Sequence, residues 1–252
     1  MRRLLPVIGW LLATPALLAS GGELEARLWA PDLSGVAQVG DGGNPTAIDL
    51  VSDLGFADDE VVEGRLIWRP SKRTSVRLGY ASFDFAASAQ LNRTVTFAGT
   101  TFDVDAQVAS VLQLDYGRLG VAWQFLSSRD GRLRIGPVIE ARGLRGDAGI
   151  TADVLGLAQI GAREEFEAAF AAAGAVLDVE PTERLHVYAE WTTTIESDNG
   201  DLTDAEAAVR YYPFDVLGLA VGYRRLEIDA FDGDELFELE LDGPFFGGVL
   251  RF

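Results

Sequence analysis

The chain has 252 residues, contains no cysteine and carries a formal charge of −18 at pH 7. The lack of cysteine excludes disulfides and thiolate metal sites, and the acidic balance argues against a nucleic-acid partner, which needs a basic face. Apolar residues make up 48% of the chain, yet beyond the first twenty positions no apolar run reaches the roughly 20 residues of a spanning helix. The composition therefore argues against a helical membrane protein.

The first segment, residues 1–21, has the pattern of a cleaved secretory signal peptide. Arg2-Arg3 supplies a positive start, residues 4–18 an apolar core, and Ala19-Ser20-Gly21 a small-x-small cleavage site. The alternative is a buried N-terminal helix. We expect residues 22–252 to form a single mature domain.

Apolar and polar residues alternate repeatedly along the rest of the chain. Between residues 185 and 196, Val187 and Trp191 fall on one face of an extended strand, while His186 and Glu190 fall on the other. A period of two predicts strands with one apolar and one polar face. Ten strands are predicted in this way, at 23–38, 61–70, 74–87, 107–126, 132–148, 163–180, 184–197, 202–213, 216–229 and 236–252.

The links between these strands alternate in length. Tight turns are predicted at 70–74, 127–132, 180–184 and 212–218, and longer, mostly acidic links at 39–60, 88–106, 149–162 and 230–235. The link 197–201 is a short exception. Residues 93–105 are predicted either to add a hairpin that turns at Ala98-Gly99 or to extend two neighbouring strands beyond their sheet. An even number of strands returns the C-terminus to the side of the N-terminus, as in an up-and-down transmembrane barrel.

The strands of a soluble β-sandwich also alternate between apolar and polar residues. The surroundings of the two strand faces therefore have to distinguish a sandwich from a barrel. In a membrane barrel the apolar face meets lipid and the polar face lines a lumen. Small residues and opposite charges on the polar faces favour the barrel. The predicted lumen-lining residues are Arg65, Arg69, Arg77, Arg134, Glu140, Arg142, Arg184, His186, Glu190, Glu206, Arg210 and Arg224. Aromatic residues near strand ends are expected in interfacial girdles: Trp29, Trp68, Tyr80, Trp123, Phe125, Trp191, Tyr211 and Tyr223.

The last strand ends in FFGGVLRF and carries a motif. Phe246, Leu250 and the terminal Phe252 share one face of the strand, with Gly248 at the intermediate position of the same face. This strand resembles the C-terminal insertion signal of bacterial outer-membrane β-barrel proteins. The resemblance implies an all-β, antiparallel up-and-down transmembrane barrel of about ten strands, with eight to twelve allowed. It also implies a place in the cell outer membrane, contact with its lipid and lipopolysaccharide, and recognition by the barrel-insertion machinery.

Two strands change phase partway along their length. In the last strand the apolar residues are odd-numbered up to Leu241 and even-numbered from Phe246, and a similar change occurs around Tyr116-Gly117-Arg118. A β-bulge at each point, near Asp242-Gly243-Pro244 in the last strand, would explain the change. Alternatively, the upper parts of the strands project above the membrane and need no lipid-facing side.

Few residues suggest enzymatic chemistry. His186 is the sole histidine, and the hydrolases of the resembled family rely on a histidine near the outer rim, whereas His186 lies near the predicted turn at 180–184. The acidic clusters are Asp58, Asp59 and Glu60, and Asp229, Asp232, Asp234 and Glu235. They lack EF-hand spacing, although loosely bound divalent cations are possible there. No cofactor, dedicated metal site or enzymatic activity is predicted.

The remaining question is what fills the barrel. Facing arginines and glutamates would form either a packed ion-pair plug in a structural surface protein or a narrow passive channel for small polar solutes. An outer-membrane hydrolase acting on lipid or peptide is the alternative function. The apolar segment 48–56 lies within the first long link, and we expect it to fold over or into the barrel mouth, or to pack on the rim.

Overall fold

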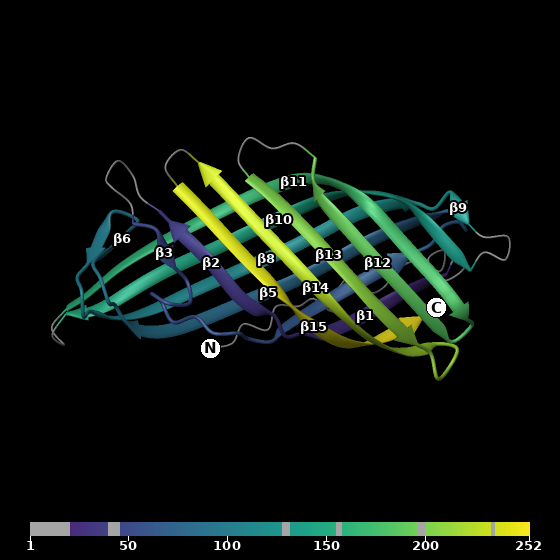
Figure 1. Cartoon of the computed structure of the whole chain (residues 1–252), viewed down its shortest axis with the longest axis horizontal. Coiled ribbons are helices and arrows are strands. Elements are labelled where there is room, and N and C mark those ends of the chain that lie inside the picture. The colour runs from purple at the N-terminus through teal and green to yellow at the C-terminus, as the bar shows by residue number, and fades with distance from the viewer. Residues whose placement is uncertain (1–20, 40–45, 128–131, 155–157, 196–199, 233–234) are drawn as a thin grey trace.

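The computed structural model describes residues 21–39, 46–127, 132–154, 158–195, 200–232 and 235–252, so the predicted signal peptide, apart from Gly21, lies outside the described residues. Ten antiparallel strands form a closed barrel (Figure 1). The closure joins the last strand to the first, with Glu23 opposite Arg251 and Trp29 opposite Phe245. The ten strands are β1 (Gly22–Trp29), β4 (Val61–Trp68), β5 (Thr74–Gln90), β8 (Gln107–Trp123), β10 (Leu133–Val154), β11 (Ala158–Thr182), β12 (Leu185–Thr194), β13 (Gly200–Tyr211), β14 (Leu217–Asp232) and β15 (Glu235–Arg251). The predicted fold class is therefore confirmed.

Five shorter strands lie at the two ends of the barrel. They are β2 (Asp32–Gln38), β3 (Ile48–Asp49), β6 (Val95–Phe97), β7 (Thr100–Phe102) and β9 (Leu126–Ser127). Three of them, β2, β3 and β9, extend the barrel sheet, and β6 and β7 form a separate hairpin. Figure 1 shows β3 and β6 at one end, called the outer end below, and β9 and the C-terminus at the other, the inner end. No helix long and apolar enough to cross a membrane occurs among the described residues.

The first predicted strand, 23–38, is divided into β1 and β2 at Ala30-Pro31. Both parts pair with β15, and the register continues across the division. Proline lacks the N–H that a ladder needs, which interrupts the strand without shifting it. The predicted hairpin at 93–105 is confirmed as β6 and β7, with positive φ at both Ala98 and Gly99.

The outer links are shorter than predicted where the strands lengthen. β10 and β11 pair continuously from Leu133 opposite Val179 to Val154 opposite Ala158, so most of the predicted link at 149–162 is strand. The prediction failed there because the outer parts of these strands carry no lipid-facing pattern.

The predicted β-bulges are wrong. β8 pairs with both neighbours in unbroken register, and β15 does the same with β14. Along β8 the even-numbered residues from Val108 to Ala122 face inward without interruption. The side chains keep their inward and outward directions past Gly117. What changes there is which of the two faces carries the apolar residues.

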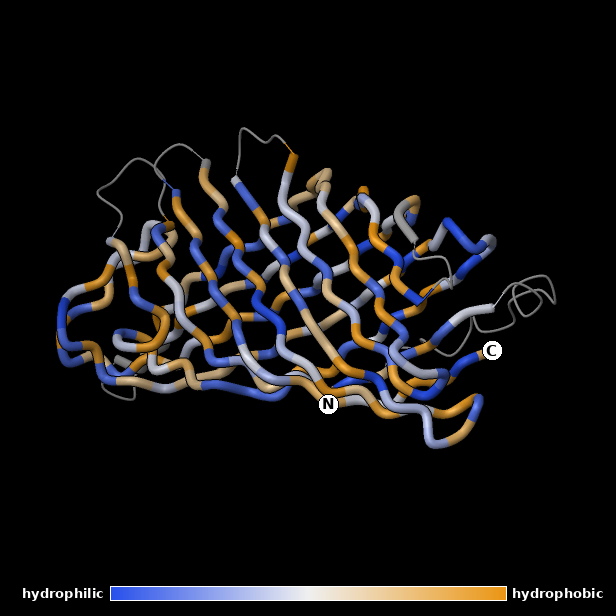
Figure 2. Tube along the Cα trace, turned by 45° about the vertical axis from the view of Figure 1, so that its right-hand side comes forward, coloured by the Kyte–Doolittle hydropathy of each residue, from blue (hydrophilic) through white to orange (hydrophobic). Residues whose placement is uncertain are grey.

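The barrel consequently has two zones with opposite patterns. In the inner zone the outward side chains are apolar, among them Ile139, Leu219 and Phe246, each at least half exposed at 50%, 63% and 61%. In the outer zone the inward side chains are apolar and form one large cluster, which includes Phe83 and Leu112. Figure 2 shows the alternation of hydrophilic and hydrophobic residues along the strands. The inner zone is the membrane-facing band, and the outer zone has the pattern of a water-soluble barrel.

Tyrosines mark the outer edge of the membrane-facing band. Tyr80 donates a hydrogen bond to Asp115 at 2.6 Å, and Tyr223 donates one to Asp242. Both carboxylates lie on the outer side of the edge, where the outward face becomes polar. On β15 the band runs from Pro244 to Phe252, close to the roughly 9–11 residues that a tilted membrane strand needs.

Trp29 does not belong to this girdle, contrary to the prediction. Its side chain is completely buried inside the barrel, and its indole N–H donates to the Gly243 carbonyl at 3.1 Å. Trp29 is odd-numbered on β1, and the odd-numbered residues of that strand point inward.

The terminal residues of the predicted insertion signal face outward or seal the barrel seam. Phe246 and Leu250 are exposed on the outer surface, while Phe252 is partly buried. The Phe252 backbone exchanges two hydrogen bonds with Gly22, at 2.8 and 3.0 Å. A Cβ at position 22 would lie 2.7 Å from the Phe252 ring, so glycine makes room for this ring at the seam.

Candidate functional site

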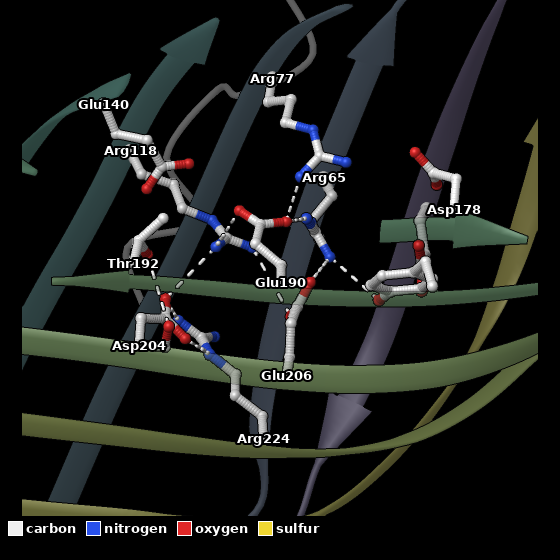
Figure 3. Close-up of polar contacts among 12 residues, drawn as sticks. Arg65, Arg77, Arg118, Glu140, Asp178, Glu190, Thr192, Asp204, Glu206 and Arg224 are labelled. Atoms are coloured by element: carbon white, nitrogen blue, oxygen red, sulfur yellow. Dashed lines mark hydrogen bonds and ion pairs between the residues drawn. The ribbon is translucent and has the colours of Figure 1, made fainter. Parts of the chain in front are cut away.

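The inner zone of the barrel is filled by charged side chains, which we call the ionic plug. Figure 3 shows part of it, with side chains from opposite walls pointing toward one another. The plug contains eight buried carboxylates and seven buried arginines, so its net charge is close to zero although the chain is strongly acidic. The carboxylates are Glu23, Glu25, Glu63, Glu140, Asp178, Glu190, Asp204 and Glu206. The arginines are Arg27, Arg65, Arg77, Arg118, Arg142, Arg210 and Arg224.

Arg65 on β4 lies at the centre of the plug. Its guanidinium donates to Glu190 at 3.0 Å, to the Tyr188 hydroxyl at 3.0 Å, and to Glu206. Glu206 also accepts from Arg27 at 2.8 Å, and these two residues are 179 positions apart in the chain. A single set of contacts thus joins β1, β4, β12 and β13 across the lumen.

Arg224 on β14 makes the most complete ion pair. Its Nε and Nη2 donate to the two oxygens of Asp204 at 3.0 and 2.8 Å, and its Nη1 donates to Glu63 at 2.9 Å. The side chain is fully buried. Such bidentate geometry is the strongest form of this interaction, and it leaves little room for water between the groups.

Small residues make space for these long side chains. Gly79 faces inward on β5, and a Cβ there would lie 2.7 Å from Nε of Arg118. Arg118 in turn approaches Asp204 at 3.3 Å and Glu190 at 3.5 Å. A larger residue at position 79 would therefore displace a member of the plug.

Aromatic side chains separate the plug from the apolar interior of the outer zone. The Arg224 guanidinium lies 4.8 Å from the Trp29 ring centroid and 5.6 Å from that of Tyr116, and Arg27 lies 4.3 Å from that of Phe245. Cations are attracted to aromatic ring faces, and the other sides of these rings suit apolar neighbours. Trp29 packs edge-on against Phe83, which belongs to the outer cluster.

The inner end of the plug is arranged around Glu23. This carboxylate accepts from Arg210 at 3.0 Å and from the Tyr212 hydroxyl at 3.0 Å, and it lies 3.3 Å from Arg69 and 3.4 Å from Arg251. Arg69 and Arg251 are only partly buried, so they close the plug toward the inner surface.

His186 also lies at this inner end. Its Nε2 is 3.1 Å from Arg251, its Nδ1 is 3.7 Å from Glu180, and its ring packs edge-on against Tyr212. The outer rim, where a hydrolase of the resembled family would need its histidine, is at the opposite end of the barrel.

Most residues predicted to line the lumen point into the barrel, but one does not. Arg184 is exposed in the turn between β11 and β12. Arg134, at the inner end, pairs with Glu180. The plug residues absent from the prediction are Glu23, Glu25, Arg27, Glu63, Arg118, Asp178 and Asp204.

These residues could have been predicted from their positions, because residues two apart in a strand point to the same side. Glu63 stands two positions before Arg65, and Asp204 two positions before Glu206, so each shares an inward face with a predicted residue. Arg118 was obscured by the bulge expected at its own position.

The apolar segment within the first long link is folded inside the outer zone. Ile48, Leu50, Leu54 and Phe56 are each no more than 4% exposed and belong to the large apolar cluster. Burial of these four side chains stabilises the segment by roughly 1.5–3 kcal/mol each. The outer zone is thus closed by a strap from the chain itself, defined here as residues 46–60.

Polar contacts fix the strap in place. Arg93 donates to Asp53, with Nε 3.4 Å from Oδ1, and to the Ala47 carbonyl at 2.6 Å. Asp58, in one of the acidic clusters, accepts from the Leu33 N–H at 2.9 Å. Asp58 therefore has a structural partner.

The strap should loosen in acid. Burial raises the pKa of Asp53, but hydrogen bonds from Arg93 and from the Asp49 N–H outweigh this and hold the pKa below its usual 3.8. The contribution of Asp53 is therefore full above pH 3.8 and is lost as the pH falls through the lower folded value. Asp53→Asn at pH 7 should cost about 1 kcal/mol locally, since Arg93 is partly exposed.

Hydrogen exchange of residues 48–56 measures this effect. After correction for intrinsic rates, exchange in the variant at pH 7 should be about fivefold faster than in the unaltered protein. The unaltered protein should approach the variant's protection at low pH. Equal protection of the two proteins at pH 7 would contradict the assignment.

The described residues contain no group of three or more acidic or histidine side chains arranged to hold a metal ion. Within the second acidic cluster, Asp234 lies outside the described residues, as does the side chain of Asp232. Asp229 faces outward on β14, and Glu235 lies at the outer end of β15.

No protein-family model and no curated protein matches the sequence. Among solved structures, the chain is similar to the outer membrane protease OmpT from Escherichia coli, with a TM-score of 0.57, 12% identity, and coverage of 91% of this chain and 97% of OmpT. The outer membrane protein OprG from Pseudomonas aeruginosa aligns more loosely, with a TM-score of 0.38, 10% identity, and coverage of 92% and 96%. The likeness to OmpT, at 12% identity, shows a shared fold and says nothing about activity. The closed ten-stranded ring, the outward apolar band and the likeness to OmpT show that the chain has the fold of an outer-membrane β-barrel.

Proposed function

We propose that the protein is a structural surface barrel whose lumen does not conduct. The observation that supports this is the ionic plug, in which Arg65, Glu190, Glu206 and their partners meet across the lumen. The apolar interior of the outer zone, with the strap folded into it, adds a second barrier along the same axis. An ion crossing the barrel would have to displace paired charges and then enter an apolar layer, which is costly.

The two barriers argue against the alternative function, a narrow passive channel. A channel for polar solutes needs a continuous hydrated path lined by groups that bind weakly. Here the inward charges are largely paired with one another, and the plug is close to neutral, which would favour neither anions nor cations. The hydrolase alternative gains no support from His186, because this residue lies at the inner end and contacts Arg251.

Planar-bilayer recordings test the proposal. The folded protein, verified by its faster gel migration before boiling, should give no reproducible single-channel openings in concentrated potassium chloride. A folded porin reconstituted in parallel provides the control for insertion and sensitivity. Reproducible unitary openings that scale with the amount of folded protein would overturn the proposal.

A further inference from the structure

An apolar cavity of about 290 Å³ lies in the outer zone, between the strap and the barrel wall. Leu50 and Phe56 of the strap line one side of it, and Leu112 of β8 and Ile150 of β10 line another. Phe166 and Phe237, whose ring centroids are 5.4 Å apart, bring β11 and β15 together beside it. The cavity is separate from the ionic plug, which lies in the inner zone.

The volume of the cavity sets the size of an occupant. A cavity of roughly 150 Å³ lined by similar side chains stays dry and binds benzene in a well-studied engineered protein. The present cavity has about twice that volume, which suits one or two fused rings or a short branched alkyl chain. Water is a poor occupant of the apolar part of the cavity, because each molecule needs two to four polar partners.

The rim of the cavity carries charge of one sign. Glu164, Glu165, Glu167 and Glu235 are all among its lining residues, and no lining residue in the described part of the chain is basic. Glu164 is exposed at an inward position of β11, so the cavity adjoins the outer surface, and Glu235 stands at an inward position of β15. Glu165 and Glu167 face outward, and Glu167 lies 3.4 Å from Arg145. The two inward carboxylates would repel an anionic head group and leave a neutral molecule unaffected.

We propose that this cavity is a binding site for a small, neutral, apolar molecule that enters from the outer side. The site is independent of the closed lumen proposed above, because the ionic plug lies between it and the inner surface. The strap forms one wall, so binding and the order of residues 46–60 are coupled.

Methyl NMR of the full mature chain in lipid nanodiscs tests the site, with naphthalene as the probe. Naphthalene should produce saturable shift changes and intermolecular NOEs at the methyl groups of Leu50, Leu112 and Ile150. Leu219 faces lipid, so its methyl shifts should change only in proportion to naphthalene partitioning. The absence of saturable changes at the three cavity residues would overturn the proposal.

A matched pair of substitutions on β11 sharpens the test. Ala168 lines the cavity, whereas its neighbour Ala169 is exposed on the outer surface. Ala168→Leu should weaken naphthalene binding at least tenfold by filling the cavity, and Ala169→Leu should leave it unchanged. If Ala168→Leu does not fold, as judged by gel migration, Ala148→Leu fills the cavity from β10. Equal binding by the folded filling variant and by Ala169→Leu would place the probe elsewhere and overturn the site.

A charged analogue of the probe provides an independent test of the site. At pH 7, 2-naphthoate has nearly the shape of naphthalene but carries a negative charge. It should bind at least tenfold more weakly than naphthalene in the unaltered protein. Saturable binding of naphthoate at the same methyl groups with equal affinity would contradict selection for a neutral ligand.

Discussion

Replacing Arg224 by methionine should lower the free energy of unfolding by about 3–5 kcal/mol, the cost of leaving buried charges without their partner. Arg224 is fully buried and satisfies both oxygens of Asp204 together with one oxygen of Glu63. Urea titration in detergent micelles, followed by the shift in gel migration between folded and unfolded protein, measures the change.

Arg225 offers a matched control at the next position. It faces outward, is more than half exposed and pairs with Glu227 and Glu240 on the surface. Arg225→Met should cost less than about 1 kcal/mol, because exposed ion pairs contribute little. The double variant Arg224→Met with Asp204→Asn should be less destabilised than the sum of its single variants, since the two residues share one contact. Equal costs for Arg224→Met and Arg225→Met would show that the plug contributes nothing specific to stability.

Ile139→Arg should destabilise the barrel by about 2–4 kcal/mol, the cost of an arginine on the lipid face near the middle of the membrane. Ile139 lies on β10 within the outward apolar band and is half exposed. Its neighbours across the ladders, Ala173 and Val121, are uncharged and offer no partner for a guanidinium.

Thr151→Arg is the control on the same strand and the same outward face. Thr151 lies beyond the outer edge of the apolar band and is exposed. The substitution should change the free energy of unfolding by no more than about 0.5 kcal/mol, because the arginine side chain at this position lies in water instead of lipid. Unfolding in lipid vesicles, measured by tryptophan fluorescence, compares the two. A similar cost at both positions would place the membrane edge elsewhere.

The strands themselves could be predicted because their evidence is local. In a strand every second side chain lies on the same face, so Val187 and Trp191 share one face. Pairing with neighbouring strands leaves these two faces unchanged. The inward direction of Arg65, Glu190 and Arg224 follows from the same parity.

The phase changes were harder to interpret from the sequence. A change from odd to even apolar positions in β15 has two explanations, a shift of the backbone or a change in what lies outside. The continuous register shows the second, with lipid opposite Phe246 and water opposite Glu238. The local sequence pattern cannot distinguish these two explanations, because it does not show how far each residue lies from the centre of the membrane.

The strands, their two faces, the closing aromatic strand and the opposite charges of the interior can all be read from the alternation of side chains along the chain. Which charges meet is visible only in the folded barrel, as with Arg27 and Glu206, which are 179 positions apart. The apolar core of the outer zone and its closure by the strap are likewise features of the folded barrel. The physical reason is that contacts across a lumen depend on how ten tilted strands are staggered when the ring closes, and that stagger is a property of the whole ring.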